Sequence, residues 1–412
     1  MNSETIVAFS HLPWKKTAHR TQTILTCLAA RRRVLFIEEP VCDFESPPHW
    51  QFQSPAPHIM VCQPYMPCDW PSYAPKQVAV WRQLMKRLGS TRTIHEPIVW
   101  LSTPLAVTLL DELDPAMVVY DCIDAIDAPR QQTPLWNECE TKLLSRADMV
   151  FTSGFSLYRT MRERHPNVHC FPSSLDLAHF RPTREAQRLG ERRTPRLIQS
   201  EPEVQARLPH PRLGFQGVLD KRVDFELLDL VARTHPEWQL VLIGPLVDLK
   251  PCQLPNRPNL HYLGPRPYED LPRYISGWDV ALVPFIANET TRHLNPVTVL
   301  EYMAAERMIV STRIPDVVEP YCDIVYVSHS PNTFIVGCEK ALRVSSIERA
   351  DRLRLMREVL SHTSWHATVR AIENAVMSML EQRRSTSLFS LPARQHSRTR
   401  NEWLRSLEMA AY

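Results

Sequence analysis

Glycine is scarce in this chain of 412 residues, which contains only nine glycines, against an average usage near 7%. Only Gly89 and Gly154 lie among the first 180 residues. A phosphate-binding loop of the GxGxxG or GxxxxGK[ST] type therefore cannot exist there, which excludes dinucleotide dehydrogenases and P-loop enzymes. Four of the later glycines are Gly214, Gly217, Gly244 and Gly264. Any nucleotide diphosphate is therefore expected to bind in the second half.

The ten cysteines show no pattern typical of a metal site. None forms a CxxC pair, and no HExxH occurs among the sixteen histidines. This argues against zinc and iron–sulfur sites. Free thiols in a reducing cytoplasm are the simplest account of the cysteines.

Long apolar runs are also missing. No stretch approaches the roughly 18 apolar residues of a transmembrane helix, and the first residues, MNSETIVAFS, lack the pattern of a signal peptide. The net charge of +3 gives no indication of nucleic acid. With 44% hydrophobic and 23% charged residues, the chain is expected to be a cytoplasmic globular protein of two domains.

What is present is a regular alternation of strands and helices. In the first half, strands are predicted at 5–10, 34–37, 98–101, 117–120, 149–152 and 168–171, with helices between them. Such alternation indicates a doubly wound parallel sheet. The proline-rich residues 40–75 are predicted to form an irregular surface excursion with short strands such as HIMVCQP, residues 58–64.

The second half repeats this pattern after a charged connection. Residues 184–209 have no clear core face and are predicted to link two domains. Strands are then predicted at 213–216, 239–243, 260–263, 280–283, 308–310 and 324–327. In such sheets ligands bind at the carboxyl ends of the strands.

One stretch of the second half, residues 288–312, combines a polar loop, a helix and a buried strand. Pro296 is predicted to open the helix. The helix N-terminus favours an anion, Arg292 in the loop adds a positive charge, and Glu301 can accept hydrogen bonds from sugar hydroxyls. The alternative is an ordinary strand–helix unit with a solvated Glu and Arg.

Two other loops carry charge at a strand end. Asp121, Asp124 and Asp127 follow a buried strand, where a carboxylate can take a proton from an acceptor hydroxyl; the alternative is capping and turn formation. Lys221 and Arg222 are predicted at the start of a helix, where cations oppose the dipole. That position favours diphosphate binding over a structural role.

Gly244 and Pro245 are predicted to form a tight turn after the strand at 239–243. The backbone of this turn can approach a nucleotide base. A turn without a binding role fits equally well.

Taken together, these segments resemble bacterial group-1 (family 4-type) glycosyltransferases of GT-B fold, in the branch that acts in cell-surface polysaccharide assembly. The resemblance covers most of residues 1–380. It is carried by SHLPW, VVYDCID, LLSRADMVFTS, GVLDKRVD, LVLIGP, NLHYLGPRPYEDLPRYISGWDVALVPF and NPVTVLEYMAAERMIVST. The last two segments are specific as a set.

The resemblance implies two doubly wound Rossmann-like domains that face each other across a cleft. Residues 1–183 would form the acceptor side and 210–360 the nucleotide-sugar domain, followed by a crossover helix at 361–384 and a basic tail at 385–412. The implied reaction moves a sugar from a nucleotide-sugar donor to a hydroxyl of a glycan or lipid-linked acceptor. It would retain anomeric configuration without a metal.

The resemblance also implies roles for single residues. Asp121 and Asp124 match the acidic acceptor-side motif and are expected to be catalytic, and Glu301 would hold the donor ribose. Basic side chains and a helix N-terminus would bind the pyrophosphate. The predicted donor-binding set is Gly217, Lys221, Arg222, Gly244, Pro245, Arg292, Asn295, Pro296, Thr298 and Glu301.

Two residues depart from the family's NPxKxxEYxAAG pattern. Thr298 stands where the family has lysine and cannot offset the charge of a departing diphosphate, a loss of a few kcal/mol. Glu306 replaces the glycine that relieves strain in a left-handed helix cap and adds a negative charge. PSSLD, at residues 172–176, also replaces the usual PNGxD.

These departures leave two main hypotheses. In the first, the enzyme is active and Arg222 and Arg292 compensate for Thr298. In the second, a degenerate glycosyltransferase fold serves as a partner or scaffold in a polysaccharide machine. A sugar-nucleotide epimerase fits the sheet pattern but not the motif set.

The basic tail from residue 385 onward offers one further expectation. Arginines dominate its charge, so the tail can contact anionic lipid at the inner membrane face, where a lipid-linked acceptor would lie. A solvated disordered tail is the alternative.

Overall fold

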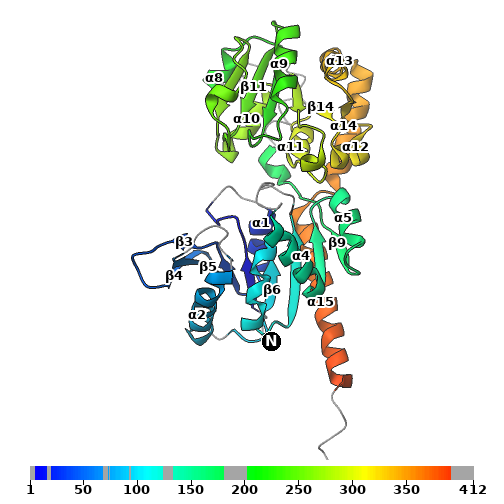
Figure 1. The fold of residues 1–412 in the computed structure, drawn as a ribbon. Helices are drawn as coiled ribbons and strands as arrows, with labels where there is room; N and C mark the ends of the chain where they lie inside the picture. The colour runs from blue at the N-terminus through cyan, green and yellow to red at the C-terminus, as the bar shows by residue number, and fades with distance from the viewer. Residues whose placement is uncertain are drawn as a thin grey trace, which may run out of the picture. The chain divides into compact units, whose positions relative to one another are not determined.

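The computed structural model describes residues 5–15, 20–67, 73, 75–91, 94–123, 133–180 and 202–390. It divides the chain into two compact units, Met1–Val369 and Arg370–Tyr412. The first unit contains two largely parallel sheets with helices packed on them (Figure 1). The alternation read from the sequence is therefore confirmed as a doubly wound α/β architecture.

The first sheet has the strand order β3-β5-β2-β1-β6-β7-β8-β9, with β4 paired to β5. Its strands are β1 (Ile6–Phe9), β2 (Val34–Ile37), β3 (Val41–Cys42), β4 (His49–Ala56), β5 (Ile59–Met66), β6 (Ile98–Leu101), β7 (Met117–Cys122), β8 (Met149–Thr152) and β9 (Val168–Cys170). The helices are α1 (Arg20–Leu28), α2 (Pro75–Thr91), α4 (Pro134–Arg146) and α5 (Phe155–Arg162), with 3-10 segments at Pro104–Glu112 and Leu177–Phe180.

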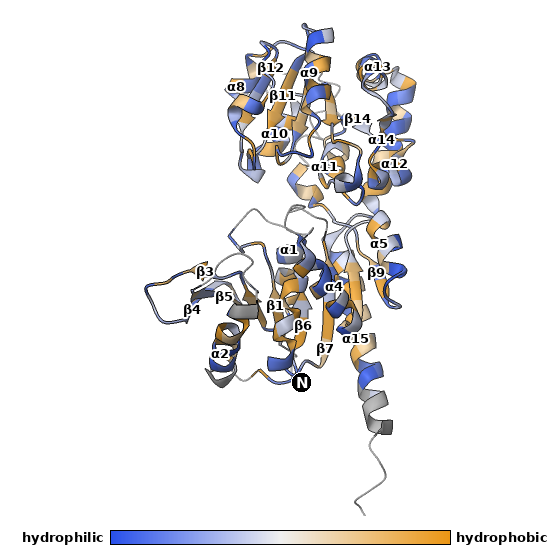
Figure 2. Cartoon of the chain, viewed as in Figure 1, coloured by the Kyte–Doolittle hydropathy of each residue, from blue (hydrophilic) through white to orange (hydrophobic). Residues whose placement is uncertain are grey.

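Short apolar runs become the central strands because both of their faces are covered. Every residue of β1, β2, β6 and β8 is buried, as expected for parallel strands between helical layers. In Figure 2 the hydrophobic colour follows the strands, whereas the hydrophilic colour lies mainly on helices and loops.

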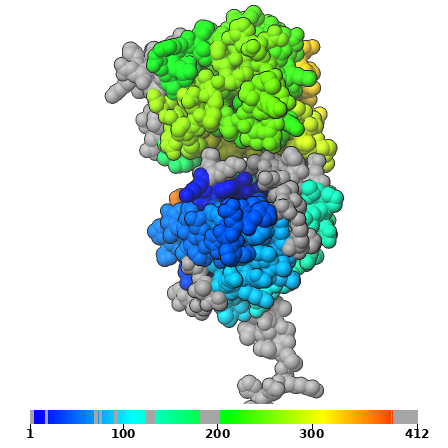
Figure 3. Space-filling model, turned by 60° about the vertical axis from the view of Figure 1, so that its left-hand side comes forward, coloured from blue at the N-terminus to red at the C-terminus, as the bar shows by residue number. Residues whose placement is uncertain are grey.

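The prediction that residues 40–75 form an irregular surface excursion is wrong, although the short strand predicted at HIMVCQP, residues 58–64, is confirmed as part of β5. β5 lies inside the sheet and pairs in parallel with β2 from Val34↔Ile59 to Ile37↔Cys62. β4 pairs with β5 in the antiparallel direction and is exposed along most of its length, and the blue atoms of this region lie on the face seen in Figure 3. Pro55 is tolerated because an edge strand has an unpaired side. Proline density therefore concealed β4, a strand of eight residues, and the place of β5 inside the sheet.

The second sheet is entirely parallel, in the order β12-β11-β10-β13-β14-β15. Its strands are β10 (Arg212–Gln216), β11 (Gln239–Ile243), β12 (Leu260–Gly264), β13 (Val280–Val283), β14 (Met308–Thr312) and β15 (Tyr326–Ser328). The helices are α8 (Glu203–Ala206), α9 (Phe225–Thr234), α10 (Leu271–Ser276), α11 (Thr298–Ala304), α12 (Pro315–Tyr321), α13 (Pro331–Leu342), α14 (Ser346–Ser361) and α15 (Trp365–Ser390), with 3-10 segments at Pro251–Gln253, Tyr268–Asp270 and Glu289–Thr291.

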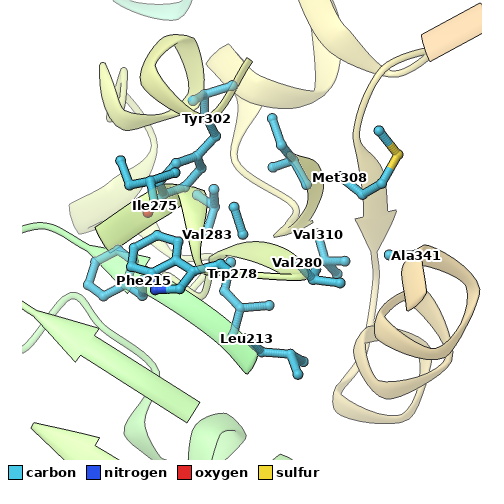
Figure 4. Packing of buried hydrophobic residues seen from close by; sticks show 14 of the residues in the cluster. Leu213, Phe215, Ile275, Trp278, Val280, Val283, Tyr302, Met308, Val310 and Ala341 are labelled. Atoms are coloured by element: carbon cyan, nitrogen blue, oxygen red, sulfur yellow. The ribbon is translucent and has the colours of Figure 1, made fainter. Parts of the chain in front are cut away.

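Trp278 lies in the core of this second sheet, only 1% exposed. Figure 4 shows its ring among Phe215, Ile275 and Tyr302. Gly214 in β10 leaves space for the ring, since a Cβ there would lie 1.9 Å from Trp278 Cδ2. A glycine is therefore required where the strand passes beneath the indole.

The predicted linker at 184–209 is only partly described, because residues 181–201 lie outside the described ranges. Its last part is not a solvated connection. Gln205 in α8 is fully buried, accepts a hydrogen bond from Trp278 Nε1 at 2.9 Å and donates one to the Tyr274 carbonyl at 2.8 Å. Residues 203–206 therefore pack with the second sheet, while the other domain boundaries stay predictions.

The predicted crossover helix at 361–384 corresponds to α15, which begins at Trp365 and extends to Ser390. Near its start, Thr368 Oγ1 lies 2.9 Å from Ser174 Oγ, which follows β9 of the first sheet. That contact agrees with a helix that returns toward the first sheet, and the rest of its path stays a prediction. Residues 391–412 of the basic tail lie outside the described residues.

Candidate functional site

Three loops meet at the carboxyl edge of the second sheet. Gly217 N donates to the Ile243 carbonyl at 3.0 Å, and Leu219 N donates to the Pro245 carbonyl at 2.9 Å. Ile286 N, just after β13, donates to the Arg222 carbonyl at 2.8 Å. Backbone hydrogen bonds thus join the loops that follow β10, β11 and β13, at the edge where parallel sheets bind ligands.

Gly217 and Gly244 are in direct backbone contact. Gly244 has φ +149, and a Cβ at this position would lie 1.7 Å from the Gly217 oxygen. Glycine is therefore required at 244 for the two loops to pack. This geometry fits the packing of the two loops, and it fits the approach of a nucleotide base equally well. Pro245 is exposed. The predicted contact of Gly244 and Pro245 with a nucleotide base therefore stays a prediction.

The basic pair Lys221–Arg222 lies before the helix and not at its start, so this part of the prediction is wrong. α9 begins at Phe225, and the Asp224 side chain caps it by accepting from Leu227 N at 2.8 Å. Because an acid occupies the cap, no cation opposes the helix dipole there.

The Arg222 guanidinium is paired with a carboxylate two residues earlier. Its Nη2 lies 2.6 Å from Asp220 Oδ2, its Nε lies 3.0 Å from the same oxygen, and the Arg222 side chain is only 11% exposed. Lys221 is exposed. The sequence reading overlooked Asp220, although the adjacent letters DKR were the available signal. Arg222 can bind a phosphate in place of Asp220 or bridge the two.

The loop before α11 is occupied by contacts of its own. Asn295 Nδ2 donates to the Ser153 carbonyl, which follows β8. Arg292 Nη1 lies 3.4 Å from Glu289 Oε2, and the Arg292 side chain is 59% exposed. α11 begins at Thr298 with Val297 as its cap residue, two residues later than the predicted start at Pro296. The predicted donor contacts of these loop residues stay predictions.

Glu301 is buried and lacks a partner at one oxygen. The residue is only 5% exposed, and its Oε2 has no hydrogen-bond partner among the described residues. Burial raises the pKa of this carboxyl to about 7. The alternative of a solvated glutamate is therefore wrong. A buried carboxylate without donors is unfavourable, and a ligand hydroxyl that donates to Oε2 would relieve this cost.

Thr298 lies one turn before Glu301 in α11. Its Oγ1 is buried and has no hydrogen-bond partner in the described part of the chain. The hydroxyl brings no positive charge to the helix N-terminus, in agreement with the departure noted in the sequence. Thr298 and Glu301 together therefore leave two buried oxygens on one short helix without partners.

Glu306 adopts the left-handed cap conformation that the family's glycine would adopt, with φ +57. Its charge is balanced, because Arg357 Nη2 in α14 lies 2.9 Å from Glu306 Oε1. The residue is 3% exposed. Glu306 thus brings the negative charge that the sequence indicated, and Arg357 pairs with that charge.

Asp121 is fully buried at the end of β7 and makes three polar contacts of 3.3 Å. Its partners are Arg20 Nη2, Thr21 Oγ1 and Trp100 Nε1. These contacts describe a structural anchor that joins α1, β6 and β7, and the catalytic role stays a prediction. The sequence reading missed Arg20, whose burial no local pattern indicates. Asp124 and Asp127 lie outside the described residues.

Two searches of the described residues were negative. No group of three or more His, Cys, Asp or Glu side chains lies in an arrangement that could hold a metal ion. None of the helices described is long and apolar enough to cross a membrane.

Comparison with known proteins gives a family match and one curated relative. Residues 210–343 match the family model described as Glycosyl transferases group 1. TuaH of Bacillus subtilis (strain 168), named as a teichuronic acid biosynthesis glycosyltransferase, is 23% identical over 274 residues. The alignment covers 62% of this chain and 65% of that relative, so the chain spans just under two thirds of its length.

Solved structures share the fold at low identity. The sucrose-phosphate synthase from Thermosynechococcus elongatus superimposes with a TM-score of 0.67 at 14% identity, over 92% of this chain and 100% of that one. HepE from Anabaena, in complex with UDP and glucose, gives 0.64 at 12% identity, over 90% and 99% of the two chains. The predicted GT-B fold of two Rossmann-like halves is confirmed.

Proposed function

We propose that this chain, a GT-B protein whose residues 210–343 form a group 1 glycosyltransferase domain, transfers a sugar from a nucleotide-sugar donor to a hydroxyl. The acceptor is a glycan or a lipid-linked glycan in cell-surface polysaccharide biosynthesis. The family match over the second sheet and the curated relative named for teichuronic acid biosynthesis support this proposal.

The unpartnered carboxylate of Glu301 is the observation that carries the proposal. It lies on α11, whose Tyr302 hydroxyl accepts a hydrogen bond from Gln216 N of β10 at 2.8 Å. Gln216 directly precedes the Gly217 loop, so Glu301 is held beside the joined loops at the sheet's carboxyl edge. A pair of ribose hydroxyls is the kind of donor that a carboxylate at this edge would accept.

The diphosphate would bind backbone N–H groups of these loops together with the basic pair. Lys221 is exposed and can reach a phosphate without breaking a contact seen in the fold. Arg222 must share its guanidinium with Asp220. The loop after β10 would thus offset the negative charge of the leaving diphosphate, in place of a lysine at position 298. Retention of anomeric configuration and transfer of a hexose without a metal are part of the same proposal.

Isothermal titration calorimetry with UDP-, GDP- and dTDP-sugars tests the donor class. We expect one nucleotide to bind, and Glu301→Gln to weaken that binding at least tenfold, since the amide replaces one acceptor oxygen with a donor NH2 group and removes the negative charge. Glu226→Gln, at an exposed side chain of α9, is the matched control and should leave binding unchanged. Absence of binding at millimolar concentration for every donor would end the proposal.

A second candidate is a non-catalytic glycosyltransferase fold that acts as a partner or scaffold. The observation in its favour is that Thr298 supplies no cation, while Arg222 and Arg292 are already paired with Asp220 and Glu289. Restoring the family residues by Thr298→Lys and Glu306→Gly separates the two candidates. Donor turnover by the native protein, with little gain from restoration, would contradict the scaffold role.

Contact with anionic lipid through the basic tail belongs to the same proposal for a lipid-linked acceptor. Co-sedimentation with vesicles of mixed neutral and anionic lipid tests it. The full chain is expected to bind, to lose binding at high salt, and to bind less when residues 385–412 are deleted. Equal binding by the two proteins would remove the tail from the proposal.

A further inference from the structure

A buried polar cluster joins the turn between β8 and α5 to the second sheet. Asp316, in the first turn of α12, accepts hydrogen bonds from Ser156 N at 2.8 Å and from Ser156 Oγ at 2.9 Å. The two residues are 160 positions apart in the chain and are only 3% and 6% exposed. Hydrogen bonds to a charged acceptor are among the stronger ones, and burial strengthens them further.

The same serine hydroxyl also contacts the loop before α11. His293 Nδ1 lies 3.1 Å from Ser156 Oγ. Because the only hydroxyl hydrogen points to Asp316, the ring must donate from Nδ1, which completes a relay from His293 through Ser156 to Asp316. Two residues later, Asn295 Nδ2 donates to the Ser153 carbonyl.

The backbone at this turn is fitted closely to the acid. A Cβ on Gly154 would lie 2.0 Å from Asp316 Oδ2, so a side chain there would displace the carboxylate. Arg159 and Glu319 add two bonds of 2.6 and 2.8 Å beside the cluster. Their side chains are 56% and 47% exposed, so this pair contributes little. The buried relay is what fixes the contact.

We propose that Ser156 and Asp316 are positioning residues, which hold the loop at residues 288–296 in the conformation that presents α11 to the donor. This inference rests on the proposed function, because the loop leads directly into the helix that carries Thr298 and Glu301. The turn after β8 of the first sheet thereby keeps the loop at residues 288–296, in the second half of the chain, in one conformation. Neither residue touches the reacting atoms.

The test compares UDP binding and hydrogen exchange in matched variants of the full chain. Ser156→Ala and Asp316→Ala remove the relay, and Ser156→Thr keeps its hydroxyl. Ser145→Ala, at an exposed serine of α4, and Asp323→Asn, at an exposed acid after α12, serve as controls.

We expect the two relay variants to raise the UDP Kd about fivefold to tenfold, the scale of one or two lost buried hydrogen bonds. Amides of residues 288–297 should exchange faster, while kcat for donor turnover changes less than KM. Ser156→Thr and both controls should remain close to the wild type. If Asp316→Ala does not fold, Ser156→Ala still provides the comparison, since it keeps the backbone bond to Asp316.

An unchanged UDP Kd in Ser156→Ala and Asp316→Ala would overturn the inference, even with faster exchange, because the contact would then be structural only. Failure of the wild type to bind UDP, GDP or dTDP is a different result and overturns the proposed function. In that case the exchange of residues 288–297 alone decides whether the relay holds the loop.

Discussion

Glu301 makes the chemistry of the donor half sensitive to pH. A folded-state pKa of about 7, against the ordinary glutamate value of 4.5, means that the folded protein binds more protons than the unfolded chain between these two values. The stability that the neutral carboxyl contributes is complete below about pH 4.5 and is lost as pH rises through 7. Its size is roughly 3 kcal/mol at most.

Replacing Glu301 by glutamine should remove this dependence. Urea unfolding between pH 5 and 8 is expected to show falling stability in the native protein and a flatter profile in Glu301→Gln. If a ribose hydroxyl donates to the carboxylate, UDP-glucose affinity should also rise with pH over this range. If the stability of the native protein and that of the variant change with pH in the same way, the raised pKa does not belong to Glu301.

Gly244 should be intolerant of any side chain. Gly244→Ala places a methyl group 1.7 Å from the Gly217 oxygen and should cost at least about 1–3 kcal/mol, since backbone must move. The control is Gly89→Ala in α2, where nothing lies within 4 Å of an added Cβ; it should stabilise by roughly 0.5–1 kcal/mol. Chemical denaturation of both variants checks the pair. A neutral Gly244→Ala would show that the two loops can separate.

At the scale of elements, the end of α11 depends on a residue that the helix geometry does not favour. Glu306 has φ +57 and a partly buried bond to Arg357, whose side chain is 41% exposed. Glu306→Ala keeps the strain and removes the bond, so it should cost about 1–3 kcal/mol. Glu306→Gly should cost about 1 kcal/mol less, because glycine accepts this φ freely.

Thermal unfolding of the two variants measures that difference. Glu358→Ala, at a side chain that is 64% exposed on α14, is the matched control and should change stability little. Equal losses in Glu306→Ala and Glu306→Gly would show that the cap is not strained.

Elements with a strong local signal could be predicted, and those decided by distant contacts could not. Val34–Ile37 and Ile98–Leu101 are apolar runs bounded by polar residues, and both are central strands. β4 was hidden by a proline that an edge position tolerates, whereas β5 was predicted as a short strand at residues 58–64 without its place inside the sheet. α8 carries no apolar face, and the burial of Gln205 in it goes with hydrogen bonds to Trp278 and Tyr274 that are distant in the sequence.

The candidate site followed the same rule. Glu301 was identified from its place in a strand–loop–helix unit and from the family resemblance, and its burial agrees with a binding role. The pairing of Arg222 with Asp220 and of Glu306 with Arg357 changed the charge balance that the sequence indicated. Asp316 was missed altogether, since its partner Ser156 lies 160 residues away.

At the scale of the whole molecule, each sheet has its own hydrophobic core. Two cores with few shared residues need not unfold together, so we expect calorimetry to show two overlapping transitions. A nucleotide that binds only the second sheet should shift one of them, by about 2.7 kcal/mol at a hundredfold excess over Kd. Asp316→Ala should move the two transitions apart, because it removes a buried link between the sheets.

Differential scanning calorimetry at several UDP concentrations measures these shifts. Asp323→Asn is the control that should leave the spacing of the transitions unchanged. A single transition, shifted as a whole by UDP, would show that the two cores form one cooperative unit.

The position of β1 has a consequence for biosynthesis. β1 leaves the ribosome before the other described strands of its sheet, lies in the middle of that sheet and pairs with β6, so that Ile6 must wait for Ile98. β10 waits in the same way for β13. Each nascent half therefore exposes an apolar strand while some 70 to 90 further residues are translated, a period when aggregation competes with folding. We therefore expect chaperones to bind the nascent chain in two successive periods, one for each sheet.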